Sequence, residues 1–506
     1  MKKNVIKYLE FSCSRFPGKT AVIDEAESLT YAELLRRSRI IGSAIARRSQ
    51  PRSPVPVLMD KSAVALSAFL GIAYADCFYV LLNPELPAAR LEQIREVLDA
   101  QWVITDDAHR ETALALFPAD RVLTADALLS EEEDAGLLAR RQAGQLDLDP
   151  LYANFTSGST GVPKGVVVGH RSVLDFIDVF TREFGFSDSD VFANQAPFDF
   201  DVSVKDIYSA LAVGGTLVIV PRRLFSLPTE LLDFLCQHKV TVMVWAVSAL
   251  CLISTFHGLD YRVPETVRQV LFSGEVMPLK HLNTWMEHLP QARFVNLYGP
   301  TEITCNCTYH VIDRQRDYSA GIPIGLPFSN EQVFLLDSED REVSEPGVSG
   351  ELCVRGTALA LGYYNAPEQT AAHFVPNPLN PHYPELIYRT GDLAHYNEGG
   401  ELVFAGRKDF QIKHMGHRIE LEEIERAISQ VPGIERACCI FEERRSKLLG
   451  FYVGDMDKKE LHKALSEKLP VFMVPGSLTQ VEQMPMTKNG KIDRKALAEL
   501  KRGDRR

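Results

Sequence analysis

The chain has 506 residues, of which 45% are hydrophobic, and a formal net charge of −12 at pH 7. A chain of this length exceeds one ordinary domain, so two or more domains are expected, with enough apolar residues for a large core. The acidic charge argues against nucleic acid as a partner, and no apolar run approaches the roughly 20 residues that a membrane span requires.

The N-terminal segment and the cysteines indicate a cytoplasmic protein. Residues 1–10 lack the uninterrupted apolar stretch of a signal peptide. Nine cysteines are scattered along the chain, and an odd count fits reduced thiols. Cys305-x-Cys307 and Cys438–Cys439 lack the spacing of a zinc site. We therefore expect a soluble cytoplasmic protein that has neither a membrane segment nor a disulfide framework.

Short β-branched runs alternate with amphipathic stretches through the first half of the chain. Val55–Met59 is typical of a strand, and Ser62–Tyr74 has helical spacing. Ser130–Pro150 is rich in Glu, Asp and Ala and is expected to be an exposed connection. The alternation predicts an α/β fold with largely parallel sheets. Further buried strands are predicted at Trp102–Thr105, Leu217–Val220, Thr241–Trp245 and Val270–Phe272.

A domain boundary is expected near Gly406–Asp409. Glu401–Ala405 reads as a strand that follows an Asn-Glu-Gly-Gly turn. The pattern therefore predicts a large domain of parallel and mixed sheets over residues 1–408 and a small α+β domain over 409–506. A helix and two paired strands are predicted after the boundary at Ile419–Ser429, Ala437–Phe441 and Leu448–Val453.

A glycine-rich segment, Asn154–Gly165, combines several hydroxyl side chains with Lys164. Glycine lets backbone N–H groups approach an anion closely, and hydroxyls and a lysine add donors that suit phosphate oxygens. The segment is not a Walker A loop, because Lys164 follows Val162-Pro163 and not a glycine. By itself it is equally typical of a turn between two strands, so both interpretations stay open at this point.

The segment Asn296–Glu302 follows a strand-like run, and α/β sheets bind ligands where their strands end. Tyr298 suits stacking on a base, Thr301 suits a phosphate contact, and Glu302 offers the carboxylate oxygens that Mg²⁺ prefers. The alternative is an ordinary Gly-Pro turn with a capping threonine.

Two further segments carry candidate nucleotide contacts. Tyr388–Leu393 supplies Asp392, which suits the vicinal hydroxyls of a ribose or, alternatively, serves as a turn residue. Thr487–Arg494 presents Lys491 after an Asn-Gly turn. A lysine on such a turn is either solvated or able to stabilise charge that builds up on a phosphate.

Taken in order, these segments resemble the adenylation domains of nonribosomal peptide synthesis, within the acyl- and aryl-CoA ligase and luciferase superfamily. The resemblance covers nearly the whole chain. It rests in addition on Leu29–Leu34, Phe200–Ser203, Gly350–Gly356, Gly406–Glu425, Leu469–Pro475 and Asn489–Arg494.

Within this family the chain looks most similar to stand-alone enzymes of the D-alanine–carrier protein ligase type, on Ser273–Pro278 and Glu420–Glu425. It departs from the family at Asp76-Cys77, where Ala-Gly is usual, and at His414-Met415, where Ile-Arg is usual. The second departure places in doubt whether this chain makes the contact that the arginine makes in other family members.

The resemblance implies two half-reactions with ATP and Mg²⁺ as cofactors. A carboxylate attacks the α-phosphate to give an adenylate and pyrophosphate, and a phosphopantetheine thiol then attacks the adenylate. It implies catalytic roles for Lys491, Thr301 and Glu302, of which Glu302 holds the metal, and a hinge at Asp409. The implied nucleotide contacts are Thr156, Ser157, Gly158, Ser159, Thr160, Gly161, Lys164, Asn296, Tyr298, Asp392 and Arg407.

The resemblance implies that the activated acid is an amino acid, because amino-acid-activating members of the family pair the buried substrate ammonium with an aspartate at this motif position, here Asp201. Its alternative role is to cap the helix that starts near Val204. The mixed set of pocket residues favours a small amino acid, alanine of either hand or serine. The second choice is an acidic or other polar amino acid, whose side chain Lys205 would pair. Lys205 could instead turn to solvent or to Asp206. The other pocket positions implied are Val202, Lys205, Val244, Leu271, Ser273, Leu297, Cys305 and Asn306.

The chain ends soon after Lys491 without a carrier module, so the expected acceptor is a separate phosphopantetheinylated carrier protein. Two alternatives remain. One is an acyl- or aryl-CoA ligase that uses free coenzyme A, against which Asp201 argues. The other is a non-catalytic adenylate-binding or scaffold protein, against which the joint presence of Lys491, Glu302 and Asp392 argues.

Overall fold

The computed structural model describes residues 2–158, 162–442, 445–486 and 492–503, with the backbone alone for the last three. The chain divides into two compact units. The first comprises Met1–Pro84, Asp99–Asn154 and Gly165–Lys408, and the second comprises Glu85–Leu98, Phe155–Lys164 and Asp409–Arg506. The second unit thus contains a helix and the glycine-rich segment from the first half of the sequence as well as the C-terminal part.

The largest sheet of the described chain has nine strands in the order β15-β14-β13-β12-β11-β9-β10-β1-β2. Its central pairs, from β1 through β10, β9, β11 and β12 to β13, are parallel, whereas β2, β14 and β15 pair antiparallel at the edges. The strands are β1 (Thr20–Ile23), β2 (Ser28–Thr30), β9 (Val191–Asn194), β10 (Thr216–Ile219), β11 (Val242–Ala246), β12 (Gln269–Ser273), β13 (Arg293–Tyr298), β14 (Thr308–Val311) and β15 (Leu326–Pro327).

A second sheet has seven strands within the described residues, in the order β19-β8-β7-β4-β3-β5-β6. The pairs among β3, β4, β5, β6 and β7 are parallel, and β19 pairs antiparallel with β8. The strands are β3 (Pro54–Leu58), β4 (Phe78–Leu82), β5 (Val103–Thr105), β6 (Val122–Thr124), β7 (Pro150–Thr156), β8 (Lys164–Gly169) and β19 (Gly362–Tyr363).

A third sheet lies in the last part of the first unit, and each of its pairings given by the described residues is antiparallel. Hydrophobic patterning indicated one of its strands, near Glu401–Ala405, but not the sheet as a whole. The strands are β16 (Glu331–Leu336), β17 (Glu342–Val343), β18 (Gly350–Gly356), β20 (Phe374–Pro376), β21 (Leu386–Tyr396) and β22 (Leu402–Arg407).

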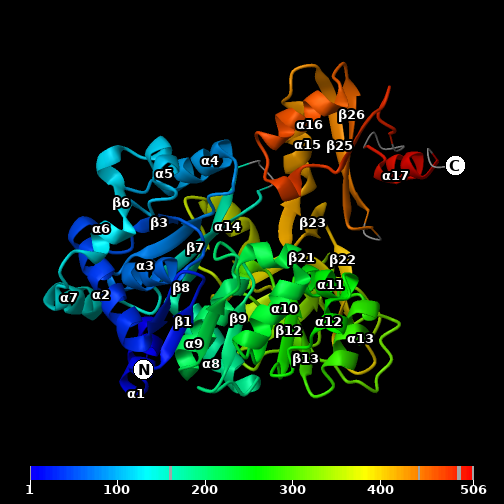
Figure 1. Cartoon of the computed structure of the whole chain (residues 1–506). Helices are drawn as coiled ribbons and strands as arrows, with labels where there is room; N and C mark the ends of the chain where they lie inside the picture. Colours follow the sequence, from blue (N-terminus) through cyan, green and yellow to red (C-terminus); the bar gives the residue numbers. More distant parts are fainter. Residues whose placement is uncertain (1, 159–161, 443–444, 487–491, 504–506) are drawn as a thin grey trace. The chain divides into compact units, whose positions relative to one another are not determined.

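Helices of the first unit follow the amphipathic stretches. α2 begins with a capping box, in which Thr30 and Glu33 bond each other's backbone N–H, and α3 begins after the N-cap Ser62. Figure 1 shows α8 and α9 side by side. The helices are α1 (Ile6–Arg15), α2 (Tyr31–Arg48), α3 (Ala63–Tyr74), α5 (Arg110–Leu116), α6 (Ala125–Leu129), α7 (Ala135–Gly144), α8 (His170–Glu183), α9 (Val202–Val213), α10 (Pro228–Gln237), α11 (Val247–Thr255), α12 (Gly258–Tyr261), α13 (Leu279–His288) and α14 (Pro367–His373).

In the second unit, the C-terminal helices and strands enclose a core of their own. The antiparallel hairpin of β23 and β24 turns at Met415-Gly416, where both φ angles are positive (53° and 81°), as a two-residue hairpin turn requires. The elements are α4 (Ala88–Leu98), β23 (Gln411–His414), β24 (His417–Glu420), α15 (Leu421–Ser429), β25 (Ile434–Glu442), β26 (Lys447–Gly454), α16 (Lys458–Ser466), β27 (Ser477–Gln480) and α17 (Arg494–Gly503).

The α/β class with parallel and mixed sheets is confirmed, and the predicted strands and helices recur with ends shifted by at most three residues. The exposed connection predicted over Ser130–Pro150 is wrong in part, because α7 lies within it. Asp134 caps this helix by accepting from the Leu137 N–H at 2.8 Å, and Leu138 is buried. The acidic composition of the segment concealed this single buried face.

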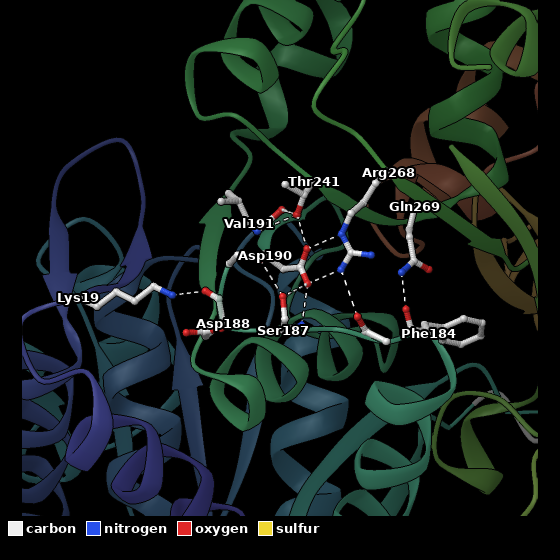
Figure 2. Close-up of polar contacts among 11 residues, drawn as sticks. Lys19, Phe184, Ser187, Asp188, Asp190, Val191, Thr241, Arg268 and Gln269 are labelled. Atoms are coloured by element: carbon white, nitrogen blue, oxygen red, sulfur yellow. Dashed lines mark hydrogen bonds and ion pairs between the residues drawn. The ribbon is translucent and has the colours of Figure 1, made fainter. Parts of the chain in front are cut away.

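The amino-terminal edge of the nine-stranded sheet is held by the buried carboxylate of Asp190, which directly precedes β9 (Figure 2). Its oxygens accept hydrogen bonds from the Ser187 N–H, the Thr241 hydroxyl and Arg268 Nε, each at 2.8 Å. Thr241 Oγ1 in turn accepts from the Val191 N–H at 2.9 Å. One carboxylate therefore joins the starts of β9, β11 and β12.

Candidate active site

Four of the predicted pocket residues share one face of the nine-stranded sheet. Val244 of β11 pairs with Leu271 of β12, which pairs with Val295 of β13. Ser273 and Leu297 lie two residues further along their strands, and side chains two apart point to the same face. Since these strands are parallel, this face near their carboxyl ends is where an α/β sheet takes a ligand.

Helix α9 contributes the predicted charged pocket residues. Asp201 occupies the N-cap position but its side chain makes no capping hydrogen bond, so the alternative role as a helix cap is not supported. Lys205, one turn later, is completely buried, and its Nζ donates to Asn306 Oδ1 at 2.7 Å and to Ser273 Oγ at 3.4 Å. Lys205 therefore faces other predicted pocket residues and does not extend to solvent.

Asn306, which contacts Lys205, lies in a segment after β13 that has an unusual backbone conformation. Thr304 and Cys305 both have positive φ angles, 54° and 75°. Gly299 allows the close approach, since a Cβ there would lie 2.5 Å from Asn306 Cα. The Cys305 thiol donates to the Asp201 carbonyl at 3.1 Å, and burial raises its pKa well above the usual value, so it remains a protonated thiol and not a nucleophile.

Tyr298, Asp392 and Arg407 meet as a hydrogen-bonded group, although they come from three strands. The Tyr298 hydroxyl donates to one carboxylate oxygen of Asp392, and Arg407 Nη1 lies 2.6 Å from the other oxygen. Burial raises the pKa of Tyr298, so its hydroxyl stays a donor. The sequence indicated each of the three as a nucleotide contact but not their mutual contacts.

Glu302 is completely buried just beyond the end of β13, and its Oε1 accepts a hydrogen bond from the Tyr363 hydroxyl at 2.7 Å. Tyr363 was not predicted, because nothing local to its short strand signals a partner so distant in sequence. Among the residues that the structure describes, no group of three or more His, Cys, Asp and Glu side chains is placed to hold a metal ion. A single oriented carboxylate still fits Mg²⁺, which takes most of its ligands from water and phosphate.

The described part of the glycine-rich segment already binds an anionic group within the second unit. The Gly158 N–H donates to Glu423 Oε2 at 3.2 Å, and the Ser157 hydroxyl donates to the Arg418 carbonyl at 2.7 Å. Arg90 lies 2.6 Å from the other oxygen of Glu423, and both side chains are more than nine-tenths buried. The Gly158 N–H thus donates to a carboxylate oxygen, as the N–H groups of an anion-binding loop do to a phosphate.

The remaining predicted contacts are placed as follows. Thr156 ends β7, and its buried hydroxyl has no hydrogen-bond partner among the residues that the structure describes. Lys164 begins β8, and Thr301 precedes Glu302. The Asn296 amide donates to the Pro323 carbonyl at 2.8 Å, and Asp409 is the first residue of the C-terminal part of the second unit. Outside the described residues lie Ser159, Thr160, Gly161 and Lys491.

Comparison with known proteins finds relatives that match nearly the whole chain. Zwittermicin A synthase ZmaJ of Bacillus cereus is 32% identical over 99% of this chain and 95% of its own length. Bacitracin synthase 1 of Bacillus licheniformis and tyrocidine synthase 1 of Brevibacillus parabrevis are 32% and 31% identical over 98% of this chain. The chain spans only 9% and 45% of the lengths of these two longer relatives.

Solved structures share the fold. The structure of holo-PA1221, an NRPS protein containing adenylation and PCP domains, superposes with a TM-score of 0.84 at 26% identity and covers 98% of this chain and 84% of that one. The adenylation domain AlmE of Vibrio cholerae, in complex with glycyl-adenosine-5′-phosphate, gives a TM-score of 0.86 at 22% identity over 99% and 98% of the two chains. Within the described residues, no helix combines the length and the hydropathy of a membrane span.

Family models cover most of the sequence. The model described as AMP-binding enzyme matches residues 9–364, and the one described as AMP-binding enzyme C-terminal domain matches residues 423–491. These matches include the glycine-rich segment, the end of β13 and, as the last residue matched, Lys491. The chain therefore belongs to the AMP-binding, adenylate-forming enzyme family and resembles the adenylation domains of nonribosomal peptide synthases.

Proposed function

We propose that this chain activates an amino acid with MgATP, releases pyrophosphate, and transfers the aminoacyl group from AMP to the phosphopantetheine thiol of a separate carrier protein. One observation carries the choice of an amino acid. Asp201 lies at the start of α9 with a carboxylate that caps no helix, one turn from Lys205 and its pocket partners. A carboxylate in that position suits the ammonium of an amino acid, which a fatty or aryl acid lacks.

The same proposal assigns roles to the groups at the strand ends. Asp392, oriented by Tyr298 and Arg407, would accept from the ribose hydroxyls, and the Tyr298 ring would lie against the adenine. Glu302, oriented by Tyr363, would hold Mg²⁺, which when bound neutralises phosphate charge. Thr301 and the donors of the glycine-rich segment would contact the phosphates.

Lys491 is proposed as the cation that joins the substrate carboxylate to the α-phosphate, with the small domain of residues 409–506 rotating about Asp409 between the two half-reactions. Lys491→Ala is expected to lower ATP–pyrophosphate exchange by several orders of magnitude while sparing thioester formation from supplied aminoacyl-adenylate. Lys495→Ala, an exposed lysine four residues further along the chain, is the matched control and should retain both activities. Equal loss in both half-reactions would remove Lys491 from this role.

The carrier partner is supported by PA1221, whose structure contains adenylation and PCP domains. Transfer to a holo-carrier protein, compared with transfer to free coenzyme A, separates the proposal from an acyl- or aryl-CoA ligase. Exchange stimulated by fatty or aryl acids and by no amino acid would favour the ligase. Similarity to stand-alone enzymes of the D-alanine–carrier protein ligase type remains a prediction from sequence resemblance, and the cytoplasmic location remains a prediction from the N-terminal segment and the cysteines.

A further inference from the structure

Lys61, which lies between β3 and α3, connects the second sheet to the end of β9 in the nine-stranded sheet. Its Nζ donates to Asn194 Oδ1 and to the Asn194 carbonyl, each at 3.1 Å, and to the Gln195 carbonyl at 2.9 Å. These three acceptors match the three N–H groups of a lysine ammonium. None of the three residues belongs to the predicted nucleotide or pocket contacts.

Asn194 extends this contact to helix α9. The residue is completely buried, and its Nδ2 donates to Asp206 Oδ2 at 3.0 Å. An ammonium has donors and no acceptor, so Lys61 requires the oxygen end of the Asn194 amide and leaves the nitrogen end for Asp206. Without Lys61 the amide can turn by 180°, which would direct its oxygen at a carboxyl oxygen. Lys61 therefore sets which end of Asn194 meets α9.

Asp206 lies on α9 at the level of the proposed pocket. It is completely buried and follows Lys205, whose Nζ donates to Asn306 Oδ1 and to Ser273 Oγ. Adjacent residues of a helix differ by only about 1.5 Å along its axis, so a shift of the helix at Asp206 also moves Lys205. The contact with Asn194 thus holds the part of α9 that carries Lys205 in place against β9.

Gln195 extends the same contact to β11. Its carbonyl accepts from Lys61, and its Oε1 accepts from the Ala246 N–H at 3.1 Å, where β11 ends. The predicted pocket residue Val244 lies two residues earlier on the same strand. Lys61 is therefore linked, through two neighbouring residues, to two of the elements that carry the pocket. The nucleotide contacts Tyr298, Asp392 and Arg407 lie on other strands, β13, β21 and β22.

We infer that Lys61 is a positioning residue for amino acid binding, which acts on α9 through Asn194 and Asp206; the inference rests on the proposed function. Lys61 itself does not touch the substrate in this assignment. It orients the Asn194 amide, so that α9 is already in place when the amino acid enters. Without Lys61, binding of the amino acid has to order the helix as well, and preorganisation of this kind determines affinity. KM for the amino acid should rise, whereas KM for ATP should not.

The test is ATP–pyrophosphate exchange by the full chain at pH 6.5. The probe is the amino acid, among the twenty protein amino acids and D-alanine, that gives the fastest exchange. Lys61→Met keeps the side-chain length and removes the ammonium. It should raise KM for the amino acid about tenfold and change kcat and KM for ATP less than twofold. Lys61→Arg keeps the charge and should return KM for the amino acid to within about threefold of the original value.

Lys19→Met is the matched control. Lys19 Nζ donates to the carbonyl of Gly214, the C-cap of α9, at 2.7 Å and to the Asp188 carbonyl (Figure 2). This variant removes a similar lysine–carbonyl contact at the other end of the same helix. It should lower the melting temperature about as much as Lys61→Met does, with no change in KM for the amino acid. An equal rise in KM would show a general loosening of the fold and would overturn the positioning role.

The pH dependence separates Lys61 from a residue with only a structural role. Part of the residue is exposed, but burial of the ammonium lowers the pKa of Lys61 to about 7, against Asp206 and together with Arg222. A neutral amine has two N–H groups for three acceptors, whereas arginine stays charged. The ratio of KM for the unmodified chain to KM for Lys61→Arg should therefore rise about threefold from pH 6.5 to 8. Burial raises the pKa of Asp206, which Lys205 also faces, to about 8, and its titration in both proteins largely cancels from this ratio.

A double-mutant cycle tests the route through Asn194. Asn194→Ala should itself raise KM for the amino acid, and Lys61→Met should add less than about threefold in that background, because the amide on which Lys61 acts is absent. The pH-dependent ratio with Lys61→Arg decides the question if Lys61→Met does not fold. An unchanged KM in Lys61→Met, a ratio that does not depend on pH, or independent effects in the cycle would overturn this inference alone. Exchange with none of the amino acids, together with exchange driven by benzoate or butyrate, would reject the proposed function and this inference with it.

Discussion

Replacement of Asp190 by alanine tests how the pocket strands are held in register. The carboxylate is 1% exposed and accepts hydrogen bonds from Ser187, Thr241 and Arg268. Breaking a buried ion pair costs about 3–5 kcal/mol, and the lower end applies because Arg268, which is 41% exposed, regains water. We expect Asp190→Ala to lower the free energy of unfolding of the first unit by about 3 kcal/mol at pH 7.

Urea unfolding followed by tryptophan fluorescence measures this loss selectively. All three tryptophans lie in the first unit, and the indole of Trp245 donates to the Ala193 carbonyl of β9 at 2.8 Å, close to the perturbed strands. Asp188→Ala is the control, because Asp188 accepts from Lys19 through its main-chain carbonyl, which the substitution retains. Its effect should stay below about 0.5 kcal/mol.

The pH dependence gives a second readout. Burial opposes ionisation of Asp190, but Arg268, Ser187 and Thr241 prevail and hold the pKa of its carboxyl below the usual value. A carboxyl with a lowered folded-state pKa contributes its full stability above its unfolded pKa, about 3.9, and loses it as the pH falls through the lower folded value. The difference between the unmodified chain and Asp190→Ala should therefore persist at neutral pH and close at acid pH. Equal unfolding free energies at pH 7 would refute the reasoning.

Two further predictions concern the buried carboxylates of Glu302 and Glu423. Tyr363→Phe removes the hydrogen-bond donor to Glu302 Oε1. Given the proposed function, it should raise the Mg²⁺ concentration needed for half-maximal pyrophosphate exchange about tenfold, because a hydrogen bond to a charged group is worth about 1.5–3 kcal/mol. An unchanged Mg²⁺ titration would contradict the orienting role of Tyr363. Arg90→Met leaves the buried Glu423 carboxylate without its arginine partner, and should lower the free energy of unfolding of the second unit, measured by pulse proteolysis, by about 3 kcal/mol. Arg90→Met combined with Glu423→Gln should recover part of this loss. Equal proteolysis of the single variant and the unmodified chain would contradict that interpretation.

Local sequence was sufficient for features whose cause is local. Apolar periodicity located α3, β11 and β12, because the spacing of buried side chains follows the geometry of each element. The antiparallel sheet that contains β16, β18 and β21 was not predicted as a whole, since its register depends on partners up to several dozen residues apart in sequence. The helix α7 escaped for a different reason: one buried leucine is a weak signal within an acidic segment.

The same distinction between local and distant causes applies to the candidate site. The sequence by itself determined the family, the order of the nucleotide-contact segments and the residue types near the pocket, because glycines, hydroxyls and charged groups at fixed spacings are required by phosphate chemistry. Tertiary structure alone decided that Lys205 meets Asn306, 101 residues away, and that Tyr363 orients Glu302. Hydrogen bonds of buried side chains depend on which segments the sheet brings together, and no local pattern records that choice.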